Sequence, residues 1–218
     1  MTGYRLYIPK RGHYESFRDE LKKGSPEMDS ERELLREFME NRNNEDEKAV
    51  NLRVKKLNSR YSTRISGFEQ QEIVEFIVTS GFDKRLEEDG YGLVDELRYV
   101  RSNRPNNHGF IDHLSFATKY CHHCCPNKYP IYDSLNMRVM SIYFGYNDIL
   151  KVGIYGSKEK RETRLRSYED FVDCYKAFCE EFIDDDYDKS VMRRDDEGFY
   201  IDKYIQAIGG SPLRKFLP

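Results

Sequence analysis

Residues 114–134 constrain the fold of this chain more than any other stretch. The stretch begins with an apolar run, passes through the cluster Cys121–Cys125, and ends at Asp133. Pro126 and Pro130 interrupt it, and proline breaks helices because it lacks an N–H donor and its ring clashes with the preceding turn. The sequence therefore predicts a deeply packed helix, a bend, and a second helix that begins immediately after Asp133.

Composition favours a folded protein with a heavily charged surface. Of the 218 residues, 38% are apolar and 34% are charged, but there are 17 tyrosines and 13 phenylalanines. Aromatic side chains each bury a large area, so a core can form. The net charge of −3 excludes a uniformly basic nucleic-acid binder, although it leaves room for one basic face. The expected fold is mainly α, a single compact domain over residues 1–218 with at most a minor β element, or two lobes of about 1–110 and 111–218.

Apolar residues recur at helical spacing through most of the chain. Helices are predicted from Pro26 to Met39, Asp46 to Tyr61, Phe68 to about Gly81, Leu93 to Val100, Leu135 to Phe144, Ser167 to about Phe182, and Phe199 to Ile208. The alternation in residues 3–9 predicts a short edge strand. Residues 102–109 are expected to form a loop, and residues 147–166 a loop or a short hairpin.

The N-terminal residues and the cysteines indicate a cytoplasmic protein. No basic-then-apolar signal pattern occurs at the start, and no apolar run is long enough for a transmembrane helix. The number of cysteines is odd, 5, and three of them are crowded together, whereas secreted scaffolds space cysteines in disulfide pairs. We expect no membrane association.

The Cys-His-His-Cys-Cys cluster at residues 121–125 has two readings. It could contribute zinc ligands, but zinc sites usually gather two well-separated ligand pairs, and here the ligands are contiguous. On a helix the three cysteines fall on one face, where buried free cysteine is common. The prediction is therefore packing, with no metal and no cofactor. Signatures of P-loop, α/β-hydrolase and zinc-protease sites are also absent from the sequence.

Lys119 and Asp133 are the remaining candidates for chemistry. A lysine on a helix is most often a solvated surface group, and an aspartate just before a helix is most often its N-cap. Both readings stay open beside a functional one. The pair Thr118-Lys119 followed by Pro130-Ile-Tyr-Asp133 resembles the helix-hairpin-helix DNA glycosylases, which carry a lysine early in one helix and an aspartate at the start of the next. The glycines of that family's hairpin have no counterpart in residues 112–118.

This resemblance implies an enzyme that removes a modified or flipped base from DNA, as in DNA repair or phage defence. Asp133 would then be the catalytic carboxylate and Lys119 a possible Schiff-base nucleophile, which would make the enzyme an N-glycosylase and a possible lyase. Double-stranded DNA would bind one basic face. Its expected contacts are Arg101, Arg104, Lys151, Lys158, Lys160, Arg161 and Arg164, with Tyr132 for base stacking. The alternative is a non-enzymatic helical protein that binds nucleic acid or protein, in which residues 114–134 are structural.

Overall fold

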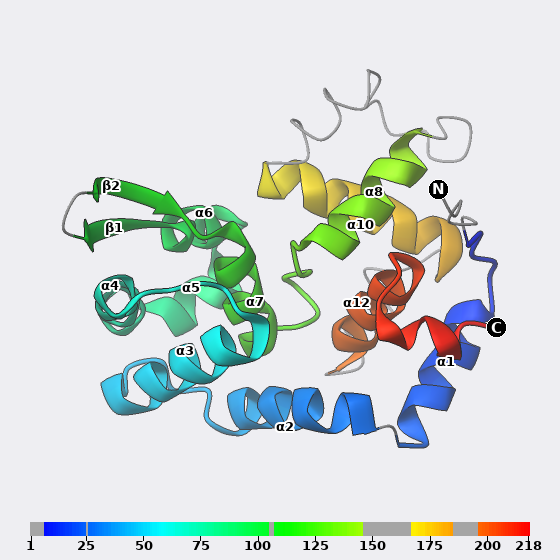
Figure 1. Cartoon of the computed structure of the whole chain (residues 1–218), viewed down its shortest axis with the longest axis horizontal. Helices are drawn as coiled ribbons and strands as arrows, with labels where there is room; N and C mark the ends of the chain where they lie inside the picture. Colours follow the sequence, from blue (N-terminus) through cyan, green and yellow to red (C-terminus); the bar gives the residue numbers. More distant parts are fainter. Residues whose placement is uncertain (1–6, 25, 105–106, 146–166, 185–195) are drawn as a thin grey trace. The chain divides into compact units, whose positions relative to one another are not determined.

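Helices dominate the computed structural model of the chain (Figure 1), which describes residues 7–24, 26–104, 107–145, 167–184 and 196–218. The prediction of a mainly α fold with a minor β element is confirmed, because these residues form helices and a two-stranded sheet. In the same part of the chain, no helix has both the length and the apolar character that crossing a bilayer requires.

The chain divides into two compact units. One, here called the continuous unit, is Ser30–Tyr132; the other, the split unit, combines Met1–Asp29 with Asp133–Pro218. This partition differs from lobes of about 1–110 and 111–218, because α1 near the start of the chain packs against α12 near its end.

The continuous unit holds most of α2 and all the elements from α3 to α7. Their bounds are α2 Pro26–Glu40, α3 Glu47–Tyr61, α4 Gly67–Thr79, α5 Phe82–Glu88, α6 Gly92–Arg98, β1 Tyr99–Arg104, β2 Asn107–Asp112 and α7 Leu114–Cys124. Side chains fix two of the helix starts. Asp46 accepts the backbone N–H groups of Lys48 and Ala49 at the start of α3, and Ser66 with Glu69 forms a capping box at the start of α4.

Helix α7 is the core of the continuous unit. It packs against α3 and α6, and every residue from Phe116 to His123 is buried. A helix that is covered on nearly all sides is buried as a whole and not only along one stripe. The predicted deep packing of this stretch is confirmed.

The split unit is built around α12. Its elements are α1 His13–Lys22, α8 Ser134–Gly145, α10 Tyr168–Phe182, α12 Glu197–Ile208 and the short 3-10 helix η1 Pro212–Phe216. Helix α12 contacts α1, α8 and η1, and every residue in it is buried. The rings of Tyr14 and Phe17 in α1 lie 5.7 and 5.4 Å from the ring of Tyr204.

Two local predictions are wrong. Residues 102–104 and 107–109, expected in a loop, lie in β1 and β2, which pair antiparallel with Tyr99 opposite Asp112. Helix α6 ends at Arg98 and not at Val100, because the chain enters β1 at Tyr99. The Arg98 guanidinium donates to both carboxylate oxygens of Asp112, at 2.9 and 2.6 Å, where the two strands meet. Helices α1 and α5 were not expected from the spacing.

The two remaining local predictions lie partly or wholly outside the described residues. Residues 7–9 of the expected edge strand carry no strand, whereas its residues 3–6 are not described. The whole of the expected loop or hairpin at 147–166 falls in the range 146–166 that the structure does not describe.

Candidate functional site

Lys119 lies in the interior of the continuous unit. Only 4% of the residue is exposed, and its Nζ donates to the Ser115 hydroxyl at 2.6 Å. The ammonium also lies 5.4 Å from the centre of the Tyr61 ring, within the range of a cation–π contact. A solvated surface position is therefore excluded for this lysine.

His123 links the backbone of Lys119 to Tyr61. Its Nδ1 lies 2.8 Å from the Lys119 carbonyl oxygen, and its Nε2 lies 3.4 Å from the Tyr61 hydroxyl. Because a carbonyl only accepts, Nδ1 must carry the proton, and in the neutral ring Nε2 accepts from the Tyr61 O–H. Side chains from α3 and α7 thus hold the lysine and its surroundings together.

Asp133 caps the N-terminus of α8. Its Oδ1 accepts the backbone N–H groups of Leu135 and Asn136, both at 2.9 Å, and its carbonyl oxygen accepts that of Met137 at 2.8 Å. The other carboxylate oxygen, Oδ2, accepts from the Gln206 side chain at 3.1 Å. The cap reading of Asp133 is correct, and the carboxylate is half-buried.

Lys119 and Asp133 belong to different units, Lys119 to the continuous one and Asp133 to the split one. The segment between them is anchored to α7, since the Tyr132 backbone N–H donates to the Thr118 hydroxyl at 3.1 Å. Tyr132 itself is half-buried.

The expected DNA-contacting residues are only partly described. Arg101 and Arg104 lie on β1, where the structure gives the backbone alone. The other five, Lys151, Lys158, Lys160, Arg161 and Arg164, lie outside the described residues.

The cysteine and histidine cluster is built into the core. Burial raises the pKa of the Cys121 thiol, and raises that of Cys124 to about 12, so both are held in the protonated form. The Nδ1 of His122 donates to the Tyr129 carbonyl at 2.8 Å. Within the described ranges, no group of three or more His, Cys, Asp and Glu side chains is placed to hold a metal ion.

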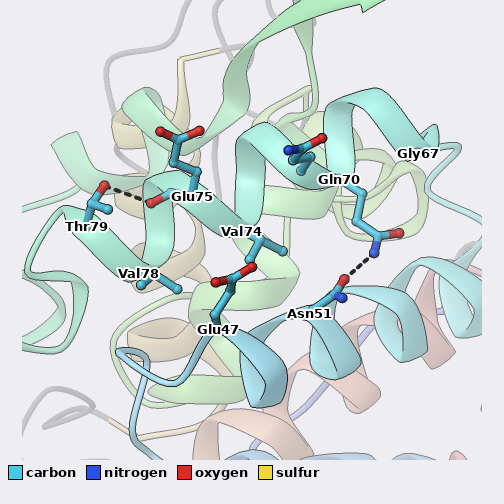
Figure 2. Close-up of a pocket in the computed structure, with 9 residues that line it drawn as sticks. Glu47, Asn51, Gly67, Gln70, Val74, Glu75, Val78 and Thr79 are labelled. Carbon is cyan, nitrogen blue, oxygen red and sulfur yellow. Dashed lines mark hydrogen bonds between the residues drawn. The ribbon is translucent and has the colours of Figure 1, made fainter.

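A pocket of about 450 Å³ opens between α3 and α4 (Figure 2), where Gln70 donates to Asn51. Glu47 and Glu75 are the charged groups that line it, and Val74 and Val78 are apolar. Carboxylates repel phosphate, so this pocket does not suit a nucleic-acid backbone.

Sequence reasoning missed a second polar network, which lies in the split unit. Asp202, Lys203 and Gln206 of α12 are all buried, and Asn136 of α8 donates to Asp202 at 2.8 Å. The signal was present in the sequence, because charged residues recur within a helix that otherwise has the apolar composition of a core helix.

Comparison with curated proteins and with solved structures found no match. One family model does match, and it covers residues 13–128, just over half of the chain, from the first residue of α1 to the segment after α7. Lys119 lies inside the matched region and Asp133 outside it. The chain belongs to the HI_0787_N family, whose model is described as an N-terminal domain.

Proposed function

We propose that the protein removes a modified or flipped base from DNA by glycosylase-like chemistry. In this proposal Lys119 supplies an amine that attacks C1′ of the sugar, and Asp133 supplies a carboxylate that stabilises the positive charge on the sugar. The amine forms a C–N bond to C1′ and gives up a proton, while the bond from C1′ to the base breaks and the base leaves with the electron pair and takes up a proton. The C1′–O4′ bond of the sugar ring then opens, which leaves the lysine joined to C1′ as a Schiff base that water later hydrolyses.

The burial of Lys119 is the observation that carries the proposal. Lysine is almost never fully buried unless it is paired, and removal from water disfavours the ammonium relative to the neutral amine. Amine nucleophiles in enzymes are activated in this way, by desolvation in an apolar pocket. The burial of Lys119 supplies this desolvation, whereas the Tyr61 ring and the Ser115 hydroxyl hold Nζ in position.

The two oxygens of Asp133 have separate partners, which also supports a catalytic role. Oδ1 is used by the helix cap, whereas Oδ2 accepts from one side chain, that of Gln206. A carboxylate has roughly four lone-pair positions, so the cap does not exhaust its capacity to stabilise a cation. Capping also fixes the orientation of the group before any substrate arrives.

The test is incubation with duplexes that carry a panel of modified bases, followed by borohydride trapping. We expect abasic products and a covalent protein–DNA adduct with the wild type. Lys119→Ala should form no adduct, whereas Lys55→Ala, a matched change at an exposed position on α3, should trap as well as the wild type. Asp133→Asn should lose excision and keep the helical circular dichroism spectrum. Absence of both products and adducts with the wild type would refute the proposal.

The contacts of Asp133 and Lys119 also support a second function, which is binding without catalysis. Every Asp133 oxygen contact given above stabilises α8 or α12, and Lys119 donates within its own helix, as structural residues do. The protein would then bind DNA or another protein without chemistry. Retardation of the duplexes in a gel, with no excision from any of them, would favour this function over the first.

A further inference from the structure

A buried lysine, a buried glutamine and Asp133 form a chain of hydrogen bonds in the split unit. Lys203 is 1% exposed and Gln206 is 8% exposed, and both lie on α12. The Lys203 Nζ donates to Gln206 Oε1 at 3.3 Å, and Gln206 Nε2 donates to Asp133 Oδ2 at 3.1 Å. The glutamine amide thus lies between an ammonium and a carboxylate.

The chemistry of the two ends fixes the orientation of the amide. An ammonium can only donate and an ionised carboxylate can only accept. The oxygen of Gln206 must therefore face Lys203 and its NH₂ group must face Asp133, since the flipped amide would oppose both neighbours. Hydrogen bonds in such a series polarise one another in the same direction, which strengthens each of them.

We propose that Gln206 is a positioning residue for the Asp133 carboxylate, and that Lys203 sets the direction of its amide. The inference rests on the proposed function, in which Asp133 is the catalytic carboxylate, and it names the residues that fix the orientation of that carboxylate. The backbone at the start of α8 holds Oδ1, and a side chain from α12 holds Oδ2. A carboxylate held at both oxygens from two helices cannot rotate freely about its Cβ–Cγ bond.

The bridging amide also separates the ammonium from Asp133. A lysine bonded directly to this carboxylate would compete for it with the positive charge that develops on the sugar. With the amide between them, the carboxylate gains a polarised donor that carries no net charge.

The first test is independent of any reaction with DNA. In the ¹H–¹⁵N spectrum, the side-chain NH₂ signal of Gln206 should lie away from that of an exposed glutamine such as Gln71, because one of its protons is bonded to a carboxylate. Both Asp133→Asn and Lys203→Met should shift the Gln206 signal and leave that of Gln71 in place. A Gln206 signal at the exposed position, or one unmoved by either change, would overturn the inference.

The second test uses single-turnover excision. Gln206→Leu removes both bonds, and Gln206→Glu keeps the acceptor for Lys203 but removes the donor to Asp133. Both should lower the excision rate constant roughly 10- to 100-fold, the usual effect of one hydrogen bond to a charged group, and leave the DNA dissociation constant within about twofold. Gln71→Leu should change neither. Weaker DNA binding with an unchanged rate constant would refute positioning.

The two tests separate failure of the inference from failure of the proposed function. If the wild-type protein excises no base, the proposed function fails, and the spectrum alone decides whether Gln206 holds Asp133. If excision is found and the Gln206 signal is that of a free amide, the function stands and the positioning role is refuted.

Discussion

Glu197→Gln should destabilise the split unit through the loss of one buried charge. The Glu197 carboxylate accepts from the Tyr14 hydroxyl at 2.6 Å and from the Arg18 guanidinium at 2.9 Å. The Glu197 side chain is 7% exposed and that of Arg18 is 14% exposed, so neither charge has much access to water. The substitution keeps an acceptor for Tyr14 and leaves Arg18 with only the exposed carboxylate of Asp19, 3.5 Å away, as a counter-charge.

The size of the effect follows from this burial. Removal of one partner from a fully buried ion pair costs about 3–5 kcal/mol, and the slight exposure of Arg18 reduces this to about 2–4 kcal/mol. For a chain of this length, each kcal/mol lowers the midpoint of thermal unfolding by roughly 2–4 °C. The expected decrease in Tm is therefore about 5–15 °C, measured by circular dichroism at neutral pH.

A matched control and a double-mutant cycle isolate the pair. Glu20 pairs with Lys23 on the exposed surface of α1, so Glu20→Gln should cost less than about 1 kcal/mol. Combining Glu197→Gln with Arg18→Met should reveal a coupling energy of about 1–3 kcal/mol. If Glu197→Gln and Glu20→Gln had equal effects, or if the coupling were zero, the reasoning would be refuted.

Two further predictions concern the free energy of unfolding measured with urea. A methyl group at Gly209 would lie 2.8 Å from a backbone oxygen of α8, so Gly209→Ala should lower the free energy of unfolding by about 1–3 kcal/mol. A methyl group at Gly67 would have no atom within 4 Å, so Gly67→Ala should raise the free energy of unfolding by up to about 1 kcal/mol. Equal effects of the two substitutions would contradict this reasoning. Folding raises the pKa of Cys124 from 9.0 to about 12, so the folded state retains a proton that the unfolded state has lost, and stability should fall as pH rises across this window. Cys124→Ala should make that fall less steep, and an unchanged slope would show that the thiol is not the titrating group.

Local signals in the sequence were sufficient to predict the long helices. Helix α3 begins after Asp46 and ends at Tyr61, as its cap and its apolar face predict, and α2 begins at Pro26, where the absent N–H of proline removes no helical hydrogen bond. The hairpin of β1 and β2 could not be read in the same way. Its Asn- and Gly-rich residues have loop composition, and the pairing depends on Arg98 and Asp112, which only the folded chain brings together.

The sequence predicted those features of the candidate site that depend on local contacts, and missed those that depend on contacts between distant residues. The capping role of Asp133 is local, since an aspartate directly before an apolar helix accepts the first free N–H groups. The burial of Lys119 was not predictable, because helical spacing cannot show that α3 and α6 cover α7 on both sides. Lys203 and Gln206 were missed because their link to Asp133 spans 73 positions of sequence.

The division of the chain into a continuous and a split unit also bears on the order of folding during synthesis. Ser30–Tyr132 is complete once its last residue leaves the ribosome, whereas the contacts of α1 with α12 must wait until α12 emerges. At typical rates of translation, the time between the synthesis of α1 and that of α12 is about 10 to 40 s. During this time Tyr14 and Phe17 lack the Tyr204 ring against which they pack in the finished protein, so we expect the newborn chain to offer them to chaperones.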